Sequence, residues 1–105
     1  MFTRHVIMQL KANAAAEFTR TVEKTILPMM RQQNGFRDEI TFISTDDSEA
    51  IANSFWETKE DADAYGHAGY PQVLKALSNV VEGTPRVGTA VVSNSTFHKI
   101  AAQTA

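Results

Sequence analysis

The sequence has no cysteine among its 105 residues. A chain without thiols forms no disulfide bonds and offers no thiolate for catalysis or metal binding. It can still build a core without such cross-links, because a domain of this length buries roughly two-thirds of the surface of its unfolded chain. We therefore expect one domain that is stabilised by its own packing.

Long apolar runs and an excess of one charge are also absent. No run approaches the roughly 18 apolar residues of a membrane-spanning helix, and the first residues lack the apolar segment of a signal peptide. The net charge is −2, from 10 Lys and Arg against 12 Asp and Glu, and the basic residues are scattered. These features predict a soluble, cytoplasmic protein that binds neither nucleic acid nor membranes.

Motifs for metals and nucleotides are missing as well. The sequence has no GxGxxG, phosphate-binding loop, HExxH or EF-hand pattern. His67 and His98 have no carboxylate or thiolate at a spacing typical of metal ligands. We expect no metal site and no cofactor.

Alternation with a period of two predicts four strands, at residues 2–10, 36–44, 50–57 and 85–95. In the first strand, one set of alternate side chains is Phe2, Arg4, Val6, Met8 and Leu10, and the other is Thr3, His5, Ile7 and Gln9. Both sets are partly apolar, so both faces of the sheet should contact other groups.

Helical spacing follows the first strand. The apolar positions that recur there are Phe18, Val22, Ile26, Met29 and Met30. We expect Asn13 to cap this helix and Asn34-Gly35 to end it in a left-handed turn. Pro28 should kink or break the helix, because proline lacks the amide hydrogen and its ring crowds the carbonyl of residue 24.

A second helical region, split in two, lies between the third and fourth strands. Thr58 should cap its first part, with Asp61 in a capping box, and Tyr65 should face inward. Tyr70-Pro71 should start its second part, since proline suits the first helical turn, and Gly83 should end it. The inward stripe of that second part is predicted to be Val73, Leu74, Leu77, Val80 and Val81.

The order βαββαβ is the ferredoxin-like α+β arrangement, an antiparallel sheet with helices on one face. We expect the domain to span residues 1–98 and residues 99–105 to form a tail. The strands carry apolar residues on both alternating sets, Ile40 and Phe42 with Ile43, Phe55 with Trp56, and Val91 with Val92, so the face without helices should be apolar too. A homodimer would cover that face, since two-fold dimers are the commonest oligomers. Edge twist and loops are the alternative cover.

Three segments resemble the antibiotic biosynthesis monooxygenase (ABM) superfamily. They are residues 26–36, with Pro-x-x-Arg-x-x-x-Gly-Phe, residues 54–62, with Trp-Glu-x-Lys-Glu-Asp-Ala, and residues 95–98. The resemblance covers about residues 3–98 and implies a dimeric α+β barrel. The superfamily includes cofactor-free quinone-forming monooxygenases, haem-degrading enzymes, isomerase-like relatives and members without known activity.

The resemblance carries over few catalytic positions. Trp56 matches the pocket tryptophan of the quinone-forming enzymes, but Ala52 and Ala62 stand where they have asparagine and tyrosine. Lys75 aligns with their pocket arginine and with the iron-binding histidine of haem-degrading members, and a protonated lysine is a poor ligand for iron. His5 stands at the strand-one asparagine of the superfamily enzymes.

These positions give two sets of candidate site residues. The candidate catalytic residues are His5, as a base if it faces the helices, Trp56, as a stacking surface, and Lys75, as a partner for an enolate or phenolate. The candidate substrate-binding residues are Phe18, Tyr65 and Tyr70. Each has a structural alternative: a hydrogen-bonded histidine, an exposed lysine, or aromatic rings that only pack.

The function that the resemblance implies is a cofactor-independent monooxygenase for a small phenolic or polycyclic compound. A non-catalytic or stress-associated dimer that binds a small hydrophobic ligand is the alternative. Haem binding or degradation ranks third, because Lys75 replaces the iron-binding histidine.

Overall fold

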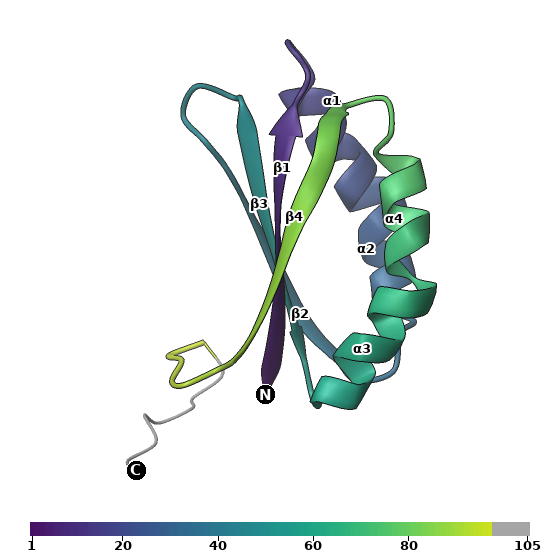
Figure 1. The fold of residues 1–105 in the computed structure, drawn as a ribbon, viewed down its shortest axis with the longest axis vertical. Helices are drawn as coiled ribbons and strands as arrows, with labels where there is room; N and C mark the ends of the chain where they lie inside the picture. Colours follow the sequence, from purple (N-terminus) through teal and green to yellow (C-terminus); the bar gives the residue numbers. More distant parts are fainter. Residues whose placement is uncertain (98–105) are drawn as a thin grey trace.

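The computed structural model describes residues 1–97, and the predicted tail at residues 99–105 lies outside them, as does His98. The chain forms two layers, a four-stranded sheet and a layer of helices (Figure 1). The elements in chain order are β1 (Phe2–Leu10), α1 (Ala15–Thr21), a π-helical segment η1 (Val22–Ile26), α2 (Leu27–Met30), β2 (Phe36–Ile43), β3 (Glu49–Trp56), α3 (Lys59–Ala68), α4 (Tyr70–Ala76) and β4 (Val81–Val91). The predicted ferredoxin-like arrangement is confirmed.

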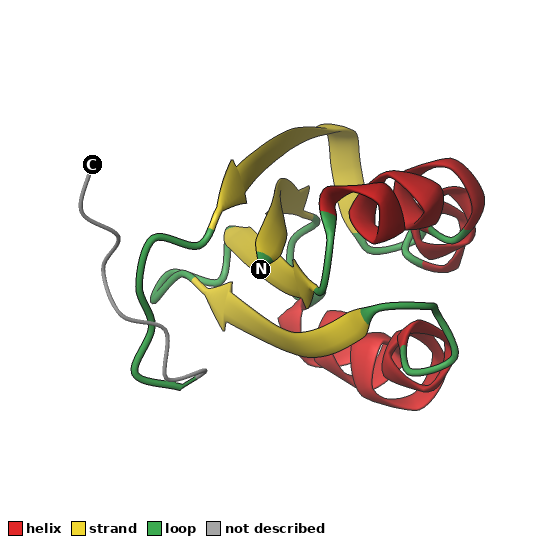
Figure 2. Ribbon diagram, turned by 90° about the horizontal axis from the view of Figure 1, so that it is seen from below, coloured by secondary structure: helices red, strands yellow, loops and turns green. Residues whose placement is uncertain are grey.

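The sheet is antiparallel throughout, with the strand order β2-β3-β1-β4. Strand β1 is therefore central, and Phe2 lies opposite both Trp56 of β3 and Val91 of β4. All the helices lie on one face of the sheet (Figure 2). Within residues 1–97, no helix is both long enough and apolar enough to span a membrane.

The helix after β1 is interrupted where Pro28 predicted a kink. The segment η1 has the wider π-helical turn, in which the N–H of Leu27 donates to the carbonyl oxygen of Val22, and Pro28 then lies in the first turn of α2. Proline tolerates that position because amides of the first turn have no partner within their own helix. The kink thus takes the form of a π segment just before the proline.

Two predicted helix boundaries in this region are wrong. Asn13 has a φ of 61° and is not the cap; Ala14 occupies that position without a side-chain hydrogen bond. Asparagine tolerates the left-handed region, so Asn13 serves the turn before the helix. The helix ends at Met30, and Gly35, with a φ of 76°, forms the turn into β2.

The predicted role of Gly83 is also wrong. Helix α4 ends at Ala76, and Gly83 lies inside β4 with a φ of 67°. The pairing register of β1 with β4 shifts nearby, between Ile7 and Gln9, which marks a bulge. Glycine with positive φ serves helix ends and bulges alike, so the sequence signal was ambiguous. Strand β4 accordingly starts earlier than predicted, and it ends at Val91.

The core lies between the two layers. Trp56 and Phe18 are its largest fully buried side chains. The other buried apolar residues are Met8, Leu10, Ala14, Ile26, Met30, Ala50, Ala62, Tyr65, Val73, Leu77 and Val80. Most of these positions match the predicted inward stripes, but Leu74 is 37% exposed.

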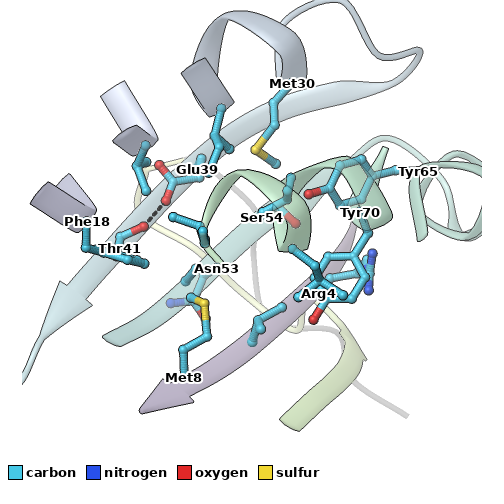
Figure 3. A pocket seen from close by; sticks show the side chains of 17 residues that line it. Arg4, Met8, Phe18, Met30, Glu39, Thr41, Asn53, Ser54, Tyr65 and Tyr70 are labelled. Atoms are coloured by element: carbon cyan, nitrogen blue, oxygen red, sulfur yellow. Dashed lines mark hydrogen bonds between the residues drawn. The ribbon is translucent and has the colours of Figure 1, made fainter. Parts of the chain in front are cut away.

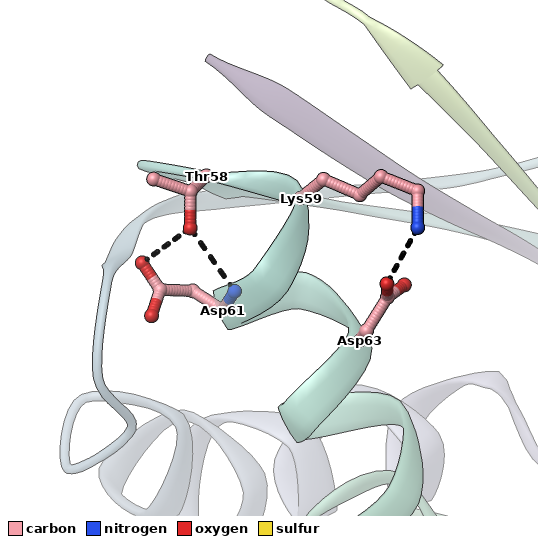
Figure 4. Close-up of polar contacts among 4 residues, drawn as sticks. All are labelled: Thr58, Lys59, Asp61 and Asp63. Carbon is pink, nitrogen blue, oxygen red and sulfur yellow. Dashed lines mark hydrogen bonds and ion pairs between the residues drawn. The ribbon is translucent and has the colours of Figure 1, made fainter.

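The predicted cap of α3 is confirmed (Figure 4). The hydroxyl of Thr58 accepts a hydrogen bond from the backbone N–H of Asp61 at 3.1 Å and donates to the carboxylate of Asp61 at 3.0 Å. Lys59 and Asp63 form an ion pair one turn apart, at 2.7 Å. The cap holds Asp61 against Gly35, where an added Cβ would lie only 2.6 Å from the Cβ of Asp61.

This contact predicts that Gly35→Ala destabilises the fold more than Gly83→Ala does. Both glycines have positive φ, which costs other residues about 1–2 kcal/mol. Only Gly35 also faces a side chain, since nothing lies within 4 Å of the Cβ position of Gly83. Displacing Asp61 would disturb the Thr58 cap, so we expect roughly 1 kcal/mol of additional loss. Urea unfolding of both variants measures the difference, and equal losses would contradict the predicted contact.

Candidate functional site

A cavity lies between the sheet and the helices (Figure 3). Its volume is about 50 Å³. Both the sheet and the helical layer line it with mainly apolar side chains. Its apolar lining is Val6 and Met8 from β1, Ala52 from β3, and Phe18, Val22, Ile26, Met30, Val73, Leu74 and Leu77 from the helical layer. Such a cavity suits a small ring compound better than a polar metabolite.

Arg4 brings a cation into this apolar lining. Alternation along β1 places its side chain on the same face as Val6 and Met8, so it is covered by helices and only 7% exposed. Its guanidinium carbon lies 4.6 Å from the ring centroid of Tyr70 and 5.1 Å from that of Tyr65. These are distances of cation–π contacts. Among the described residues, its buried Nη1 atom has no hydrogen-bond partner.

The rings beside Arg4 are fixed by their own packing. Tyr65 stacks on Trp56 with centroids 4.7 Å apart and planes 28° apart, and Phe36 meets Trp56 edge-on at 5.6 Å. The indole N–H of Trp56 donates to the buried hydroxyl of Ser54 at 2.9 Å. A tryptophan with a satisfied N–H and two aromatic neighbours is a rigid support. Trp56 therefore holds Tyr65 in place without lining the cavity itself.

Glu39 is the acidic side chain among the described residues that line the cavity. It extends from β2 and accepts a hydrogen bond from the hydroxyl of Thr41. Burial raises the pKa of the Glu39 carboxyl, and the hydrogen bond from Thr41 partly offsets that shift. In Figure 3, Glu39 and Arg4 lie on opposite sides of the lining side chains. A carboxylate with a raised pKa is a better proton acceptor than an ordinary surface carboxylate.

The predicted substrate-binding residues come together. Phe18, Tyr65 and Tyr70 all line the cavity, from α1, α3 and α4. Their contact with a substrate stays a prediction.

The predicted catalytic residues do not come together in the cavity. His5 lies on the opposite face of the sheet, because it alternates with Arg4 and its ring covers Gly88 of β4. Lys75 is exposed on α4 and does not line the cavity, and Trp56 is buried behind Tyr65. The predicted placement of His5 and Lys75 around the pocket is therefore wrong. The reason is the direction in which each side chain leaves its element. His5 points to the face of the sheet away from the helices, and Lys75 points from α4 into solvent.

Sequence reasoning missed Arg4 and Glu39 as site residues. A signal for Arg4 was present, since it is the one charged residue in the alternating set Phe2, Arg4, Val6, Met8 and Leu10. A charge on the buried face of a strand is rare unless it has a partner or a function. No comparable signal marked Glu39, because β2 is an edge strand on which charged residues are common.

Within residues 1–97, no group of three or more histidine, aspartate or glutamate side chains is placed to hold a metal ion. Neither His5 nor His67 lines the cavity.

Comparison with known proteins finds solved structures that have a similar fold. No protein-family model matches the sequence, and no curated protein matches it. Solved structures do match. One is a monooxygenase from the gene ActVA-Orf6 of Streptomyces coelicolor in complex with nanaomycin D, at 16% identity over 90% of this chain and 88% of that chain, with a TM-score of 0.74. A second is SnoaB, a cofactor-independent oxygenase from Streptomyces nogalater, at 18% identity over 90% and 95%, with a TM-score of 0.71.

A third match is a Nitrosomonas europaea structure provisionally named an antibiotic biosynthesis monooxygenase. Its identity is 15% over 88% of this chain and 98% of that chain, with a TM-score of 0.71. The chain thus has the fold of the ABM structures, as its sequence motifs predicted. Identities this low show the fold alone.

The burial of Tyr65 predicts a loss of stability in alkali. Burial raises the pKa of Tyr65 to about 12, against an unfolded value of about 10, although Arg4 opposes the shift. The unfolded state therefore releases its proton first. The stabilising contribution is complete below pH of about 10 and is lost as the pH rises toward 12.

Urea unfolding between about pH 8 and 11 tests this effect. The unfolding free energy of the wild type should fall with pH more steeply than that of Tyr65→Phe, which has no ionisable hydroxyl. A smaller slope should remain in Tyr65→Phe, because burial also raises the pKa of Tyr70. Identical slopes would show that Tyr65 is not buried as described.

Proposed function

We propose that this chain, which shares its fold with the ABM structures, is a cofactor-independent monooxygenase for a small phenolic or polycyclic compound. The observation that carries the proposal is the cavity itself. It is apolar, lies between the sheet and the helices, and contains one carboxylate and one guanidinium, Glu39 and Arg4. Two solved proteins of the same fold are named as a monooxygenase and a cofactor-independent oxygenase, which supports the reaction class.

The chemistry would rest on the substrate and on molecular oxygen. Glu39 would accept a proton from an acidic C–H of the ring compound, and the resulting carbanion would react with O₂ to give a peroxide anion at that carbon. The peroxide anion would take the proton back from Glu39 and become a hydroperoxide. Loss of the second C–H proton with departure of hydroxide then yields a carbonyl group and water. All oxygen and electrons are accounted for by O₂ and the substrate, so the step requires no further reductant.

Glu39 takes the place that the sequence suggested for His5. It lines the cavity, whereas His5 does not, and its raised pKa favours proton uptake. The apolar surroundings also help, because charge that develops in a dry cavity interacts more strongly with its neighbours than in water.

A second candidate is a non-catalytic protein that binds a small hydrophobic ligand. The observation that favours it is the position of His5 and Lys75 outside the cavity. Native mass spectrometry of freshly purified protein would show a retained ligand as a mass adduct. A ligand adduct together with no oxygen uptake would favour this candidate over an enzyme.

We also propose that the protein is a homodimer that uses the face of the sheet away from the helices. Phe42 and Ile40 of β2 lie on that face and are 52% and 38% exposed. With Phe55 of β3 and Phe97 they line one shallow hollow. An antiparallel sheet that faced water would carry mainly polar residues there. A second copy is the occupant we favour, because a two-fold axis pairs this apolar patch with itself.

Oxygen uptake tests the enzymatic proposal. With anthrone as the substrate, the wild type should consume oxygen above the buffer rate, and Glu39→Gln should lower kcat by about 100-fold or more, in the range of general bases. Glu82→Gln is the matched control, since Glu82 is exposed on β4 and should leave the rate unchanged. No uptake with anthrone and related tricyclic phenols would reject the monooxygenase.

Light scattering after size exclusion tests the dimer. The wild type should elute at twice the monomer mass, and Phe42→Asp should elute as a monomer, because it places a charge in the apolar patch. Val91→Asp is the control: Val91 is 67% exposed but shares the face of Phe2, on the helix side. A monomeric wild type, or a dimer that survives Phe42→Asp, would contradict the proposed interface.

A further inference from the structure

A second hollow, the outer hollow, lies beside the cavity. It is found between the helix that runs from α1 through η1 and the edge strand β2, and its volume is about 200 Å³. Four of its lining residues also line the cavity, namely Phe18 and Val22 of the helical layer and Glu39 and Thr41 of β2. The two spaces are therefore neighbours, and these four side chains form a partition between them.

The cavity alone is too small for the ring compound of the proposed function. Its volume is about 50 Å³. An engineered apolar cavity of about 150 Å³ in another protein holds one benzene molecule. Fused rings therefore need more room than the cavity offers while the partition is in place. The outer hollow is the larger of the two spaces, and both together would hold fused rings.

Val22 is the member of the partition that can yield to a ligand. Glu39 and Thr41 are joined by a hydrogen bond (Figure 3), and Phe18 is among the largest fully buried side chains of the core. Val22 is small and only partly buried, and it begins η1, where its carbonyl oxygen accepts the π-helical hydrogen bond from Leu27. Such π-helical turns are rare and occur frequently at functional sites. This turn places a small apolar side chain between the two spaces.

We propose that Val22 is the specificity-determining residue of the ligand site, and that the ligand is a fused-ring compound which displaces Val22 and occupies both the cavity and the outer hollow. The size of residue 22 then sets how far the ring system extends. This inference rests on the proposed function and names the size class of its substrate. Glu39 belongs to the partition, so it would lie beside the middle of such a ligand. In anthrone the acidic CH₂ group belongs to the central ring, which suits that position.

Fluorescence titration with two probes of different length tests the inference. 2-Naphthol has two fused rings, and 9-phenanthrol has three. Val22→Ala should bind 9-phenanthrol about tenfold more tightly than the wild type, because two carbon groups leave the partition and each methylene is worth about fourfold in affinity. The affinity for 2-naphthol should change less, since the shorter probe displaces less of the partition. Val22→Phe should weaken the binding of 9-phenanthrol by about tenfold or more.

The same substitutions at Val87 are the matched controls. Val87 is exposed on β4 and lines neither space, so Val87→Ala and Val87→Phe should bind both probes as the wild type does. If Val22→Phe fails to fold, Val22→Ile adds a single methylene and should weaken the binding of 9-phenanthrol about fourfold. The ratio of the two affinities is the decisive readout, because a general loss of packing would change the binding of both probes equally.

The outcomes distinguish this inference from the proposed function. An affinity ratio that stays constant across the Val22 variants overturns the role of Val22, as does binding of neither probe by the wild type and Val22→Ala. A ratio that follows the size of residue 22, together with no oxygen uptake from anthrone, supports the inference and rejects the monooxygenase. Oxygen uptake from anthrone that Val22→Phe leaves unchanged supports the monooxygenase and overturns the inference.

Discussion

The central strand β1 sends successive side chains to opposite faces of the sheet, and the rest of the molecule is arranged around that alternation. Its buried set packs beneath the helices, and it carries Arg4 into the core together with Met8. Its other set, which includes His5, lies on the uncovered face. A shift of one residue in the pairing of β1 would exchange the two sets. The register with β3 and β4 therefore decides which chemistry is available in the cavity.

Burial gives the few polar groups of the cavity their properties. Desolvation raises the pKa of Glu39 and of Tyr65, while Arg4 counteracts the shift at Tyr65. The aromatic cluster of Phe36, Trp56 and Tyr65 keeps the walls rigid. A cation and a carboxylate held apart in an apolar cavity can polarise a ring compound between them. This division of charge is the physical basis for the proposed reaction.

The fold is shared with oxygenases at identities below 25%, so it supplies a scaffold rather than a reaction. In this chain the positions that the superfamily resemblance marked as catalytic are largely replaced, and the residues that do line the cavity come from other positions. Arg4 comes from β1 and Glu39 from β2. Function on this scaffold must therefore be argued from the cavity of each chain.

The sequence alone determined the elements and their order. Period-two and helical spacing located the strands and helices, Thr58 and Pro28 marked local features that the structure bears out, and the motifs around Trp56 indicated the fold. These are local properties, since each depends on residues within a few positions of one another. Gly83 shows the limit, because its positive φ suits a helix end and a bulge equally. Only the tertiary structure decided which side chains share the cavity, since that depends on strand register and on which face the helices cover. Through those long-range contacts Arg4 and Glu39 entered the site, and His5 and Lys75 were left outside it.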